Sequence, residues 1–476
     1  MTGEYLSLRT LCVHAHFYQP PREDPVTGHV PQEPGAAPYK NWNEKIHAEC
    51  YRPNAQLGNF GRISFNIGPT LCEWMEDYDP GICEQIVSQD RANVERYGVG
   101  NAIAQAYNHT ILPLASNPDK VTQVRWGIAD FTHRFGRKPQ GLWLPETAAD
   151  TETLEVLVDH GIEFTILAPW QADTENLDST EPYRVPLSRG RSITVFFYNR
   201  DLSTKVSFDP GATSNADAFA RNDITRHYNQ DKLRSGDPQV VMIASDGELY
   251  GHHQQFRDRF LARLVDGAVS SQDLQITYPA LWLKYNQPKR TISIREKTSW
   301  SCHHGVTRWM GECSCTPGDG RWKYYMRNAF EHLAYSLDKL FVQYVSPHIS
   351  DPFELRNRYI EVVLGEMPVR ELIDEMAGHH VDDESSEQIY KLLEAQRLRQ
   401  RIFTSCGWFF EDFYRIEPKL VVSYAAQAAW LVRKATGVDL TPDLSADLKL
   451  VASNRTGSRA DVFLKRQLER LAHLTP

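Results

Sequence analysis

Short apolar runs alternate with helix-like stretches over residues 1–300 of the chain. Each run has the length of a strand, and several end in polar or ionisable side chains. The order strand, helix, strand predicts right-handed βαβ units and a parallel sheet. The predicted strands are residues 11–17, 63–67, 104–109, 141–144, 164–167, 193–198 and 240–245.

One of the intervening helices is marked at both of its ends. Residues 151–160 carry apolar side chains at helical spacing, Asp150 or Thr151 can cap the start, and Gly161 can end the helix.

Two long segments interrupt the alternation of strands and helices. Residues 19–43 are rich in Pro and Gly and residues 202–216 are polar, so we expect both to be irregular.

The pattern changes beyond Trp322, where Gly and Pro become sparse and apolar spacing turns helical. We therefore predict an α/β domain over residues 1–300 and an α-helical domain over residues 301–476 that completes the active-site cleft. The last stretch, residues 440–476, is either a final helix or a frayed tail. The other predicted helices of this domain are residues 324–345, 353–364, 386–403 and 419–434.

The composition narrows the classes of partner. The chain has 476 residues, 41% of them hydrophobic, and a formal net charge of -9, which argues against nucleic acid or an anionic membrane as a partner. No apolar run reaches the length of about 18 residues that predicts a transmembrane helix, and the N-terminus lacks the pattern of a signal peptide. We therefore expect a cytoplasmic protein whose eight cysteines are thiols rather than disulfides.

Two carboxylates directly follow predicted strands. Glu146 comes after residues 141–144, and Asp246 comes after residues 240–245. Carboxylates at the carboxyl ends of parallel strands are where (β/α) barrels carry their chemistry, and two that face one cavity suit cleavage of a glycosidic bond. Burial at the end of the most apolar strand is expected to raise the pKa of Asp246. The structural alternatives are an ion pair with an arginine for Glu146 and a helix N-cap for Asp246.

Further polar residues extend this candidate site. His14 and His16 are two apart on the first predicted strand, so their side chains share one face. They could bind zinc, hold sugar hydroxyls, or be hydrogen-bonded without a function. Glu248 could bind substrate or orient His252 or His253.

A segment rich in metal ligands precedes the helical domain. Its Cys-x-Cys spacing differs from the usual Cys-x2-Cys spacing of zinc sites. Three interpretations remain open: a metal site, a loop that lines the substrate cleft, and a buried linker with inert thiols. The residues are Cys302, His303, His304, Cys313 and Cys315.

Taken in order, five segments of the chain resemble the motifs of glycoside hydrolase family 57. The third segment ends in Glu146 and the fourth begins with Asp246. From residue 322 onward the chain resembles the helical region that follows the barrel in this family, with an extension resembling that of an uncharacterised subgroup. The segments are Val-His-Ala-His-Phe-Tyr-Gln-Pro (13–20), Tyr-Asn-His-Thr-Ile-Leu-Pro-Leu (107–114), Gly-Leu-Trp-Leu-Pro-Glu (141–146), Asp-Gly-Glu-Leu-Tyr-Gly-His (246–252) and Thr-Ser-Trp (298–300).

The resemblance implies an incomplete (β/α)7 barrel, retention of anomeric configuration, α-glucan substrates and no required metal or cofactor. It makes Glu146 the nucleophile and Asp246 the acid/base. The chain departs from the pattern at residues 102–105, where the family often carries a Glu, and at residues 302–304, where a glycine-rich run would be expected. The residues expected to bind substrate are His14, His16, His109, Trp143, Glu248, His252 and Trp300.

These features predict a retaining glycoside hydrolase or transglycosylase that acts on α-linked glucan or oligosaccharide. Amylase, glucanotransferase and branching activities are not distinguished, and the oligomeric state is left open. One alternative is a metal-dependent deacetylase or hydrolase on a related barrel, with His14, His16 and Asp246 as ligands. The other alternative is a carbohydrate-binding protein without catalytic activity.

Overall fold

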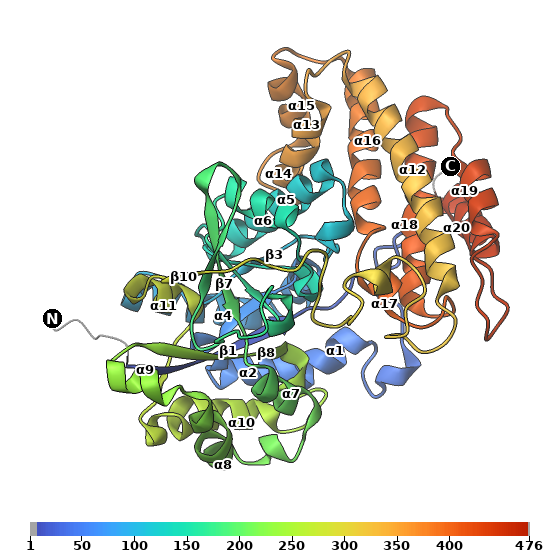
Figure 1. Ribbon diagram of the computed structural model, residues 1–476. Helices are drawn as coiled ribbons and strands as arrows, with labels where there is room; N and C mark the ends of the chain where they lie inside the picture. Colours follow the sequence, from blue (N-terminus) through green and yellow to red (C-terminus); the bar gives the residue numbers. More distant parts are fainter. Residues whose placement is uncertain (1–6, 475–476) are drawn as a thin grey trace. The chain divides into compact units, whose positions relative to one another are not determined.

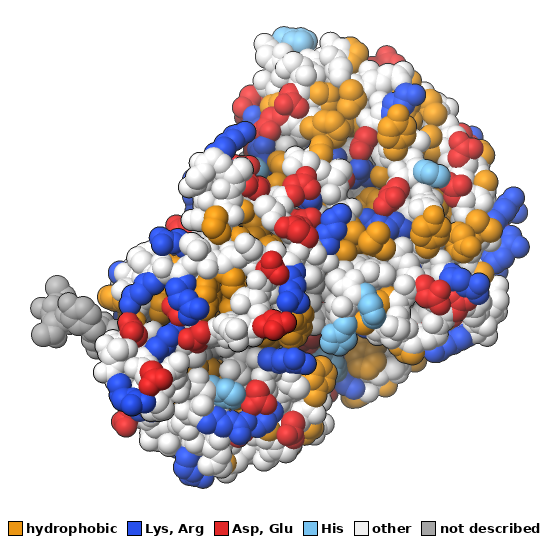
Figure 2. Space-filling view, viewed as in Figure 1, with side chains coloured by type: hydrophobic (Ala, Val, Ile, Leu, Met, Phe, Trp, Pro, Cys, Tyr) orange, Lys and Arg blue, Asp and Glu red, His pale blue; other side chains and the backbone are white. Residues whose placement is uncertain are grey.

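The structure, a computed structural model, describes residues 7–474 and contains two compact units. The barrel unit comprises residues 7–19, 32–106 and 131–300, and the helical unit comprises residues 20–31, 107–130 and 301–474. No described helix is both long enough and apolar enough to cross a membrane. Acidic and basic side chains are interspersed over the face shown in Figure 2.

Parallel strands form the framework of the barrel unit (Figure 1), and every strand predicted from the sequence has a counterpart there. β1 pairs with β2 and β8, β3 pairs with β4, and β5 pairs with β7. Isolated parallel bridges, Phe65 to Ala102 and Gly141 to Phe164, complete the order β7-β5-β4-β3-β2-β1-β8. The strands are β1 (Arg9–Phe17), β2 (Ser64–Ile67), β3 (Ala104–Gln105), β4 (Leu142–Trp143), β5 (Phe164–Leu167), β7 (Ser192–Phe197) and β8 (Gln239–Asp246).

This order is the incomplete (β/α)7 barrel that the resemblance implies. β7 and β8 stand at its two ends, where the Asn199 N–H donates a hydrogen bond of 2.7 Å to the Met242 carbonyl. Three short strands outside the order were not predicted from the sequence. They are β6 (Tyr183–Pro186), antiparallel to β7, β9 (Gln275–Ile276), parallel to β1, and β10 (Arg290–Thr291), parallel to β6.

Apolar side chains of the strands form the core of the barrel unit. β1 and β8 are buried along nearly their whole length, as expected for parallel strands that are covered on both faces. One core cluster includes Cys12, Met242, Ile166, Phe196 and Trp143. The strands that end in the polar candidate residues are thus held in place by a closely packed hydrophobic core.

Helix α6 (Thr151–Asp159) confirms the predicted helix and its caps. The Asp150 carboxylate accepts a hydrogen bond of 2.9 Å from the Thr153 N–H, and Gly161 follows the helix with a φ of +82°. The other helices of this unit are α1 (Trp42–Ile46), α2 (Arg52–Gln56), α3 (Pro69–Tyr78), α4 (Pro80–Tyr97), α7 (Arg200–Phe208), α8 (Ala216–Phe219), α9 (Gln230–Ser235), α10 (Arg257–Arg263) and α11 (Pro279–Tyr285).

Two local predictions are wrong. Residues 202–208 lie in α7 rather than in an irregular segment: the Asn199 side chain caps the helix through the Leu202 N–H, and Leu202 and Val206 are buried on one face. Most of the other residues of α7 are polar, so the hydrophobic pattern of the sequence did not indicate a helix here. Residues 104–109 are not one strand, because β3 ends at Gln105 and His109 has a φ of 55°, which extended backbone does not adopt.

The predicted helices of the helical unit are confirmed, and residues 440–474 contain two further helices. The unit also includes residues 117–130 of α5 (Asn117–Phe135). Helices α15 and α17 were not predicted. The elements are α12 (Arg321–Val345), α13 (Pro352–Arg358), α14 (Ile360–Val363), α15 (Val369–Ala377), α16 (Asp383–Arg401), α17 (Cys406–Phe409), α18 (Ile416–Thr436), α19 (Thr441–Leu448) and α20 (Ala460–Leu474).

A buried ion network joins α5 to the later helices of the helical unit. The Asp119 carboxylate lies 2.7 Å from Arg399 and 3.2 Å from Arg356. Burial acts to raise the pKa of Asp119, but the two arginines outweigh it and lower the pKa to about 2. The carboxylate is therefore ionised at neutral pH, and removing one partner would leave an uncompensated buried charge.

Candidate active site

The register of β1 explains how its two histidines are held. His14 is paired in the sheet with Ser64, and His16 is paired with Asn66 on one side and Asp246 on the other. The His14 Nδ1 lies 2.9 Å from the Ser64 hydroxyl, and the His16 Nδ1 lies 2.9 Å from the Asn66 amide nitrogen. Burial lowers the pKa of each histidine to about 3. Both imidazoles are therefore neutral at physiological pH.

Trp143 of β4 packs against both of these histidines. Its ring centroid lies 4.7 Å from that of His14 and 5.1 Å from that of His16, with nearly parallel planes in both cases. Trp300 meets the Trp143 ring edge-on at 5.1 Å. Trp143 has an exposed fraction of 0%, so it supports the histidines and presents no surface to solvent.

Glu146 lies on a tight turn directly after β4. Its φ is 57° and that of Thr147 is 49°, so both residues adopt the left-handed region that is unfavourable for side chains with a Cβ. The Trp300 indole N–H donates a hydrogen bond of 2.9 Å to the Glu146 carboxylate, and the Trp300 backbone N–H donates one of 3.0 Å to the Glu146 carbonyl. Backbone and side chain of Glu146 are thus fixed by the same residue.

The fully buried side chain of Gln171 holds this turn from the other side. Its amide oxygen accepts from the Thr147 hydroxyl at 2.8 Å, and its amide nitrogen donates to the Thr147 carbonyl at 2.8 Å. The same nitrogen donates to the Thr298 carbonyl at 3.1 Å. Gln171 therefore connects the turn that carries Glu146 to the segment that carries Trp300.

Asp246 is the last residue of β8 and has a perturbed carboxyl group. Surrounding protein atoms raise its pKa to about 8, and repulsion from Glu248 and Glu146 adds to the effect. The side chain is open to solvent rather than buried, which limits the desolvation, but the two neighbouring charges still favour the protonated form. Glu146 is thus one of the charges that act on the Asp246 carboxyl group. The side chain makes no N-cap hydrogen bond.

The residue after Asp246 must be a glycine. A Cβ on Gly247 would lie 2.3 Å from the ring of Phe17, closer than any real contact. The chain therefore turns over Phe17 at a distance that only glycine permits. This close approach fixes where β8 ends and hence where the Asp246 carboxyl group is presented.

Glu248 is buried and held by hydrogen bonds from the barrel unit. Its carboxylate accepts from the Tyr51 hydroxyl at 2.8 Å and from the Tyr18 N–H at 3.1 Å. Burial raises its pKa to about 7, although these hydrogen bonds act in the opposite direction. The His252 side chain pairs instead with Glu49, 2.6 Å away.

His109 belongs to the helical unit, whereas the other candidate residues belong to the barrel unit. Its Nδ1 is 2.5 Å from the Ser405 hydroxyl, and its carbonyl accepts from the Ser405 N–H at 2.9 Å. The side chain is buried. The remaining candidates all belong to the barrel unit: His14, His16, Trp143, Glu146, Asp246, Glu248, His252 and Trp300.

Several residues of the site were not identified from the sequence. The positions of Ser64 and Asn66 depend on the pairing of β1 with β2. Paired residues of neighbouring strands have their side chains on the same face of the sheet, which places Ser64 beside His14 and Asn66 beside His16. Gln171 and Tyr51 lie in loop and helix segments with no motif to mark them. Only the folded chain shows their contacts.

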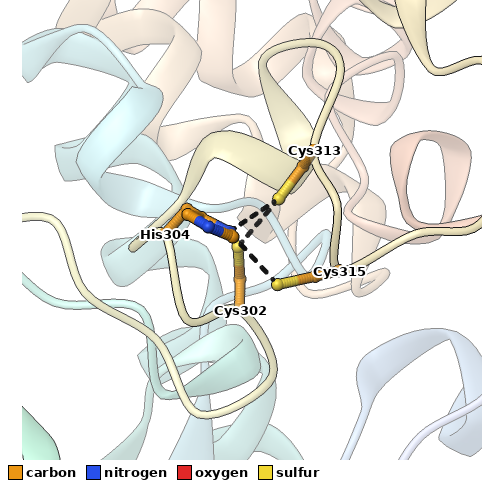
Figure 3. A group of neighbouring side chains, drawn as sticks. All are labelled: Cys302, His304, Cys313 and Cys315. Atoms are coloured by element: carbon orange, nitrogen blue, oxygen red, sulfur yellow. Dashed lines mark hydrogen bonds between the residues drawn. The ribbon is translucent and has the colours of Figure 1, made fainter.

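Among the described residues, the side chains that converge as possible metal ligands are Cys302, His304, Cys313 and Cys315 (Figure 3). His14, His16 and Asp246 do not form such a group in that part of the chain. A metal-dependent mechanism through those three residues therefore lacks the required convergence of ligand atoms.

Two family models match the chain. Glycosyl hydrolase family 57 matches residues 17–295, more than half of the sequence. A domain of unknown function (DUF3536) matches residues 319–471. The boundary between the two matches falls close to the change from alternating strands and helices to helices alone.

Comparisons with individual proteins agree with the family match. A 4-alpha-glucanotransferase from Thermococcus litoralis is 23% identical over 276 residues, which are 54% of this chain and 39% of that relative. The chain thus aligns with well under half of the length of this curated relative.

Solved structures show the same fold. An exo-type maltose-forming amylase from Pyrococcus sp. ST04 superposes with a TM-score of 0.76 at 18% identity, covering 93% of this chain and 83% of that one. A GH57-type branching enzyme from Pyrococcus horikoshii superposes with a TM-score of 0.64 at 15% identity, covering 98% and 95%. At these identities the likeness concerns the fold.

Proposed function

The chain belongs to glycosyl hydrolase family 57, and from this premise we propose that it is a retaining glycoside hydrolase or transglycosylase acting on α-linked glucan or oligosaccharide. One observation carries the proposal. Glu146 follows β4 and Asp246 ends β8 of the same barrel, and the charge of Glu146 helps to raise the pKa of Asp246 to about 8. A carboxylate beside a carboxylic acid is the pair that retaining hydrolysis of a glycoside requires.

In the proposed reaction the Glu146 carboxylate attacks the anomeric carbon. The bond from that carbon to the leaving oxygen breaks as Asp246 gives the oxygen its proton. Asp246, now ionised, then takes a proton from water or from an acceptor hydroxyl, whose oxygen attacks the same carbon and releases Glu146. Two inversions at one carbon give net retention.

The surrounding residues would bind and orient the sugar. Neutral His14 and His16 can each offer one ring nitrogen to a hydroxyl group, and Trp143 behind them would keep both rings in place. Trp300 would hold Glu146 and border a sugar subsite. Glu248 and His252 are proposed to contribute further hydroxyl contacts.

The substrate class rests on the relatives. The names of the matched proteins include 4-alpha-glucanotransferase, alpha-amylase and branching enzyme, all of which act on α-glucans. We extend that class to this chain. Whether water or a sugar is the acceptor depends on how well the loops exclude water during the second step.

The test is incubation of the full chain with α-glucans of increasing length and with aryl α-glucosides. Product masses distinguish hydrolysis from transfer, and NMR of the fresh product gives its anomeric form. We expect α-configured products, and loss of turnover on the glucans in both Glu146→Gln and Asp246→Asn. Oligosaccharide binding without turnover in the unaltered protein would favour the non-catalytic alternative instead.

A further inference from the structure

A loop of the helical unit brings three thiols and one imidazole together ahead of α12 (Figure 3). Their ligand atoms all lie within 4.8 Å of one another. The Sγ atoms of Cys302 and Cys313 are 3.5 Å apart, and the His304 Nδ1 lies 3.3 Å from the Cys313 Sγ and 3.4 Å from the Cys315 Sγ. Three sulfur atoms and one imidazole nitrogen thus lie close enough together to bind one metal ion.

We propose that Cys302, His304, Cys313 and Cys315 bind a structural Zn²⁺ ion. Tetrahedral bonds of about 2.3 Å to sulfur and about 2.0–2.1 Å to nitrogen place neighbouring ligand atoms roughly 3.5–3.8 Å apart. The observed separations lie close to this range. All four coordination positions come from the chain, which is typical of a structural site; a catalytic zinc keeps one position for water or substrate.

The ligand set of three thiolates and one imidazole favours some metal ions over others. Thiolates disfavour Mg²⁺ and Ca²⁺, which prefer oxygen ligands. Ligand atoms within 4.8 Å suit a single ion, because thiolates bound to separate irons of a cluster stand further apart. Zinc fits a tetrahedral site of three sulfurs and one nitrogen.

Positive charge beside the cluster supports thiolate ligands. Three thiolates and one Zn²⁺ carry a net charge of about -1, which nearby positive charge stabilises because Cys302 and Cys313 are buried. Lys323 is fully buried, its ammonium donates to the Arg308 carbonyl at 3.1 Å, and thiolates at Cys302 and Cys313 would act to raise its pKa. A buried lysine here would be costly next to neutral thiols and is favourable next to a metal–thiolate group.

The loop that carries the four ligands contains little regular secondary structure. Between Ser301 and Gly320 it contains one short turn of 3-10 helix, Thr307–Trp309, and no strand. Trp309 is its large buried side chain. A bound metal would supply the folding free energy that regular hydrogen bonding does not provide.

The first experiment measures the metal in the full chain purified without chelators. Mass spectrometry of the elements should find about one zinc per chain, released in step with modification of the thiols by an organomercurial. Cys313→Ser and His304→Ala should reduce the zinc content to a small fraction. The matched controls His303→Ala, an exposed neighbour outside the cluster, and Cys83→Ser should keep it.

A second measurement needs no variant. Exchange of the unaltered chain with Co²⁺ should give the visible bands of tetrahedral cobalt and the ultraviolet bands of thiolate ligation. Absence of stoichiometric zinc together with free thiols, a disulfide within the cluster, or iron in place of zinc would each overturn the proposal. These readouts do not involve glucans, so they stand or fall separately from the proposed enzymatic function.

Discussion

Trp300 holds Glu146 by two hydrogen bonds, one from its indole N–H to the carboxylate at 2.9 Å and one from its backbone N–H to the carbonyl at 3.0 Å. The second bond stabilises a residue whose φ of 57° is unfavourable. The first fixes the direction of the carboxylate. A nucleophile held in this way loses little freedom when the substrate binds.

Trp300→Phe keeps an aromatic ring and removes the indole donor. Hydrogen bonds to charged groups contribute about 1.5–3 kcal/mol, so kcat should fall roughly ten- to a hundredfold. Steady-state kinetics on a natural glucan would measure it. Trp170→Phe is the matched control, since its indole N–H donates to the Ser299 carbonyl rather than to a carboxylate. Equal losses in both variants would contradict the special role of the bond to Glu146.

Gln171 supports the same turn without reaching the carboxylate. Gln171→Ala removes four hydrogen bonds to Thr147 and Thr298, so the turn relaxes and kcat should fall about tenfold or more with little change in KM. The assay is run well below the melting temperature of the variant. Gln239→Ala, at the opposite end of β8, is the control: it removes a buried amide bonded to Asn229 and should lower Tm without this loss of kcat.

Much of this fold could be predicted from the sequence, because strands of a parallel barrel appear as continuous apolar runs between punctuated helices. Residues 240–245 show this most clearly, with β8 as the outcome. The same logic failed where the signal was short or sparse. A stripe of two apolar residues, Leu202 and Val206, does not reveal a helix. The residues of β6 alternate between buried and exposed and so form no continuous apolar run.

The candidate site could be predicted only where residues end strands or follow motifs. Glu146 and Asp246 were identified in this way, and the influence of one on the other is now apparent. Gln171 and Tyr51 could not be identified, because their partners are distant in sequence and their side chains are common in any core. The assignment of the catalytic roles stays a prediction, as does the part of the helical domain in completing the cleft.

The raised pKa of Asp246 predicts an alkaline limit to activity. The proton donor is present below its pKa of about 8, so kcat/KM on a glucan should fall as the pH rises beyond that value. Glu248→Gln removes one of the negative charges that raise this pKa, and the alkaline limb should then move to lower pH. An aryl glucoside, whose leaving group needs little protonation, should show a weaker limb. A limb that does not respond to Glu248→Gln would contradict the coupling.

Glu248 also makes stability depend on pH. Its pKa rises from 4.5 in an exposed glutamate to about 7 in the folded protein. Between these values the unfolded chain has released the proton and the folded chain still holds it, so the free energy of unfolding falls as the pH rises. Glu248→Gln cannot ionise, and its amide oxygen can still accept from Tyr51 and Tyr18.

We therefore expect the Tm of Glu248→Gln, relative to the unaltered protein, to rise between about pH 4.5 and pH 7 and to level off above. The full difference corresponds to roughly 3 kcal/mol. Thermal melts across this range would measure it, with the exposed Glu95→Gln as control. A difference that is constant with pH would mean that Glu248 titrates normally.

Exogenous azide distinguishes the roles proposed for Glu146 and Asp246. Glu146→Ala should lose turnover on every substrate, because no glycosyl-enzyme can form. Azide can occupy the vacated space and attack the sugar directly, which should restore some cleavage of an activated substrate and give a product of inverted configuration.

Asp246→Ala should behave differently. It should keep activity on aryl glucosides, whose leaving groups depart without a proton, and lose it on glucans, whose alkoxide cannot. Here azide should intercept the glycosyl-enzyme on Glu146 and give a product of retained configuration. NMR of the glycosyl azides from both variants would determine their anomeric configuration. Retention with Glu146→Ala and inversion with Asp246→Ala would show that the roles are exchanged, and full activity of either variant on a natural glucan would reject this site.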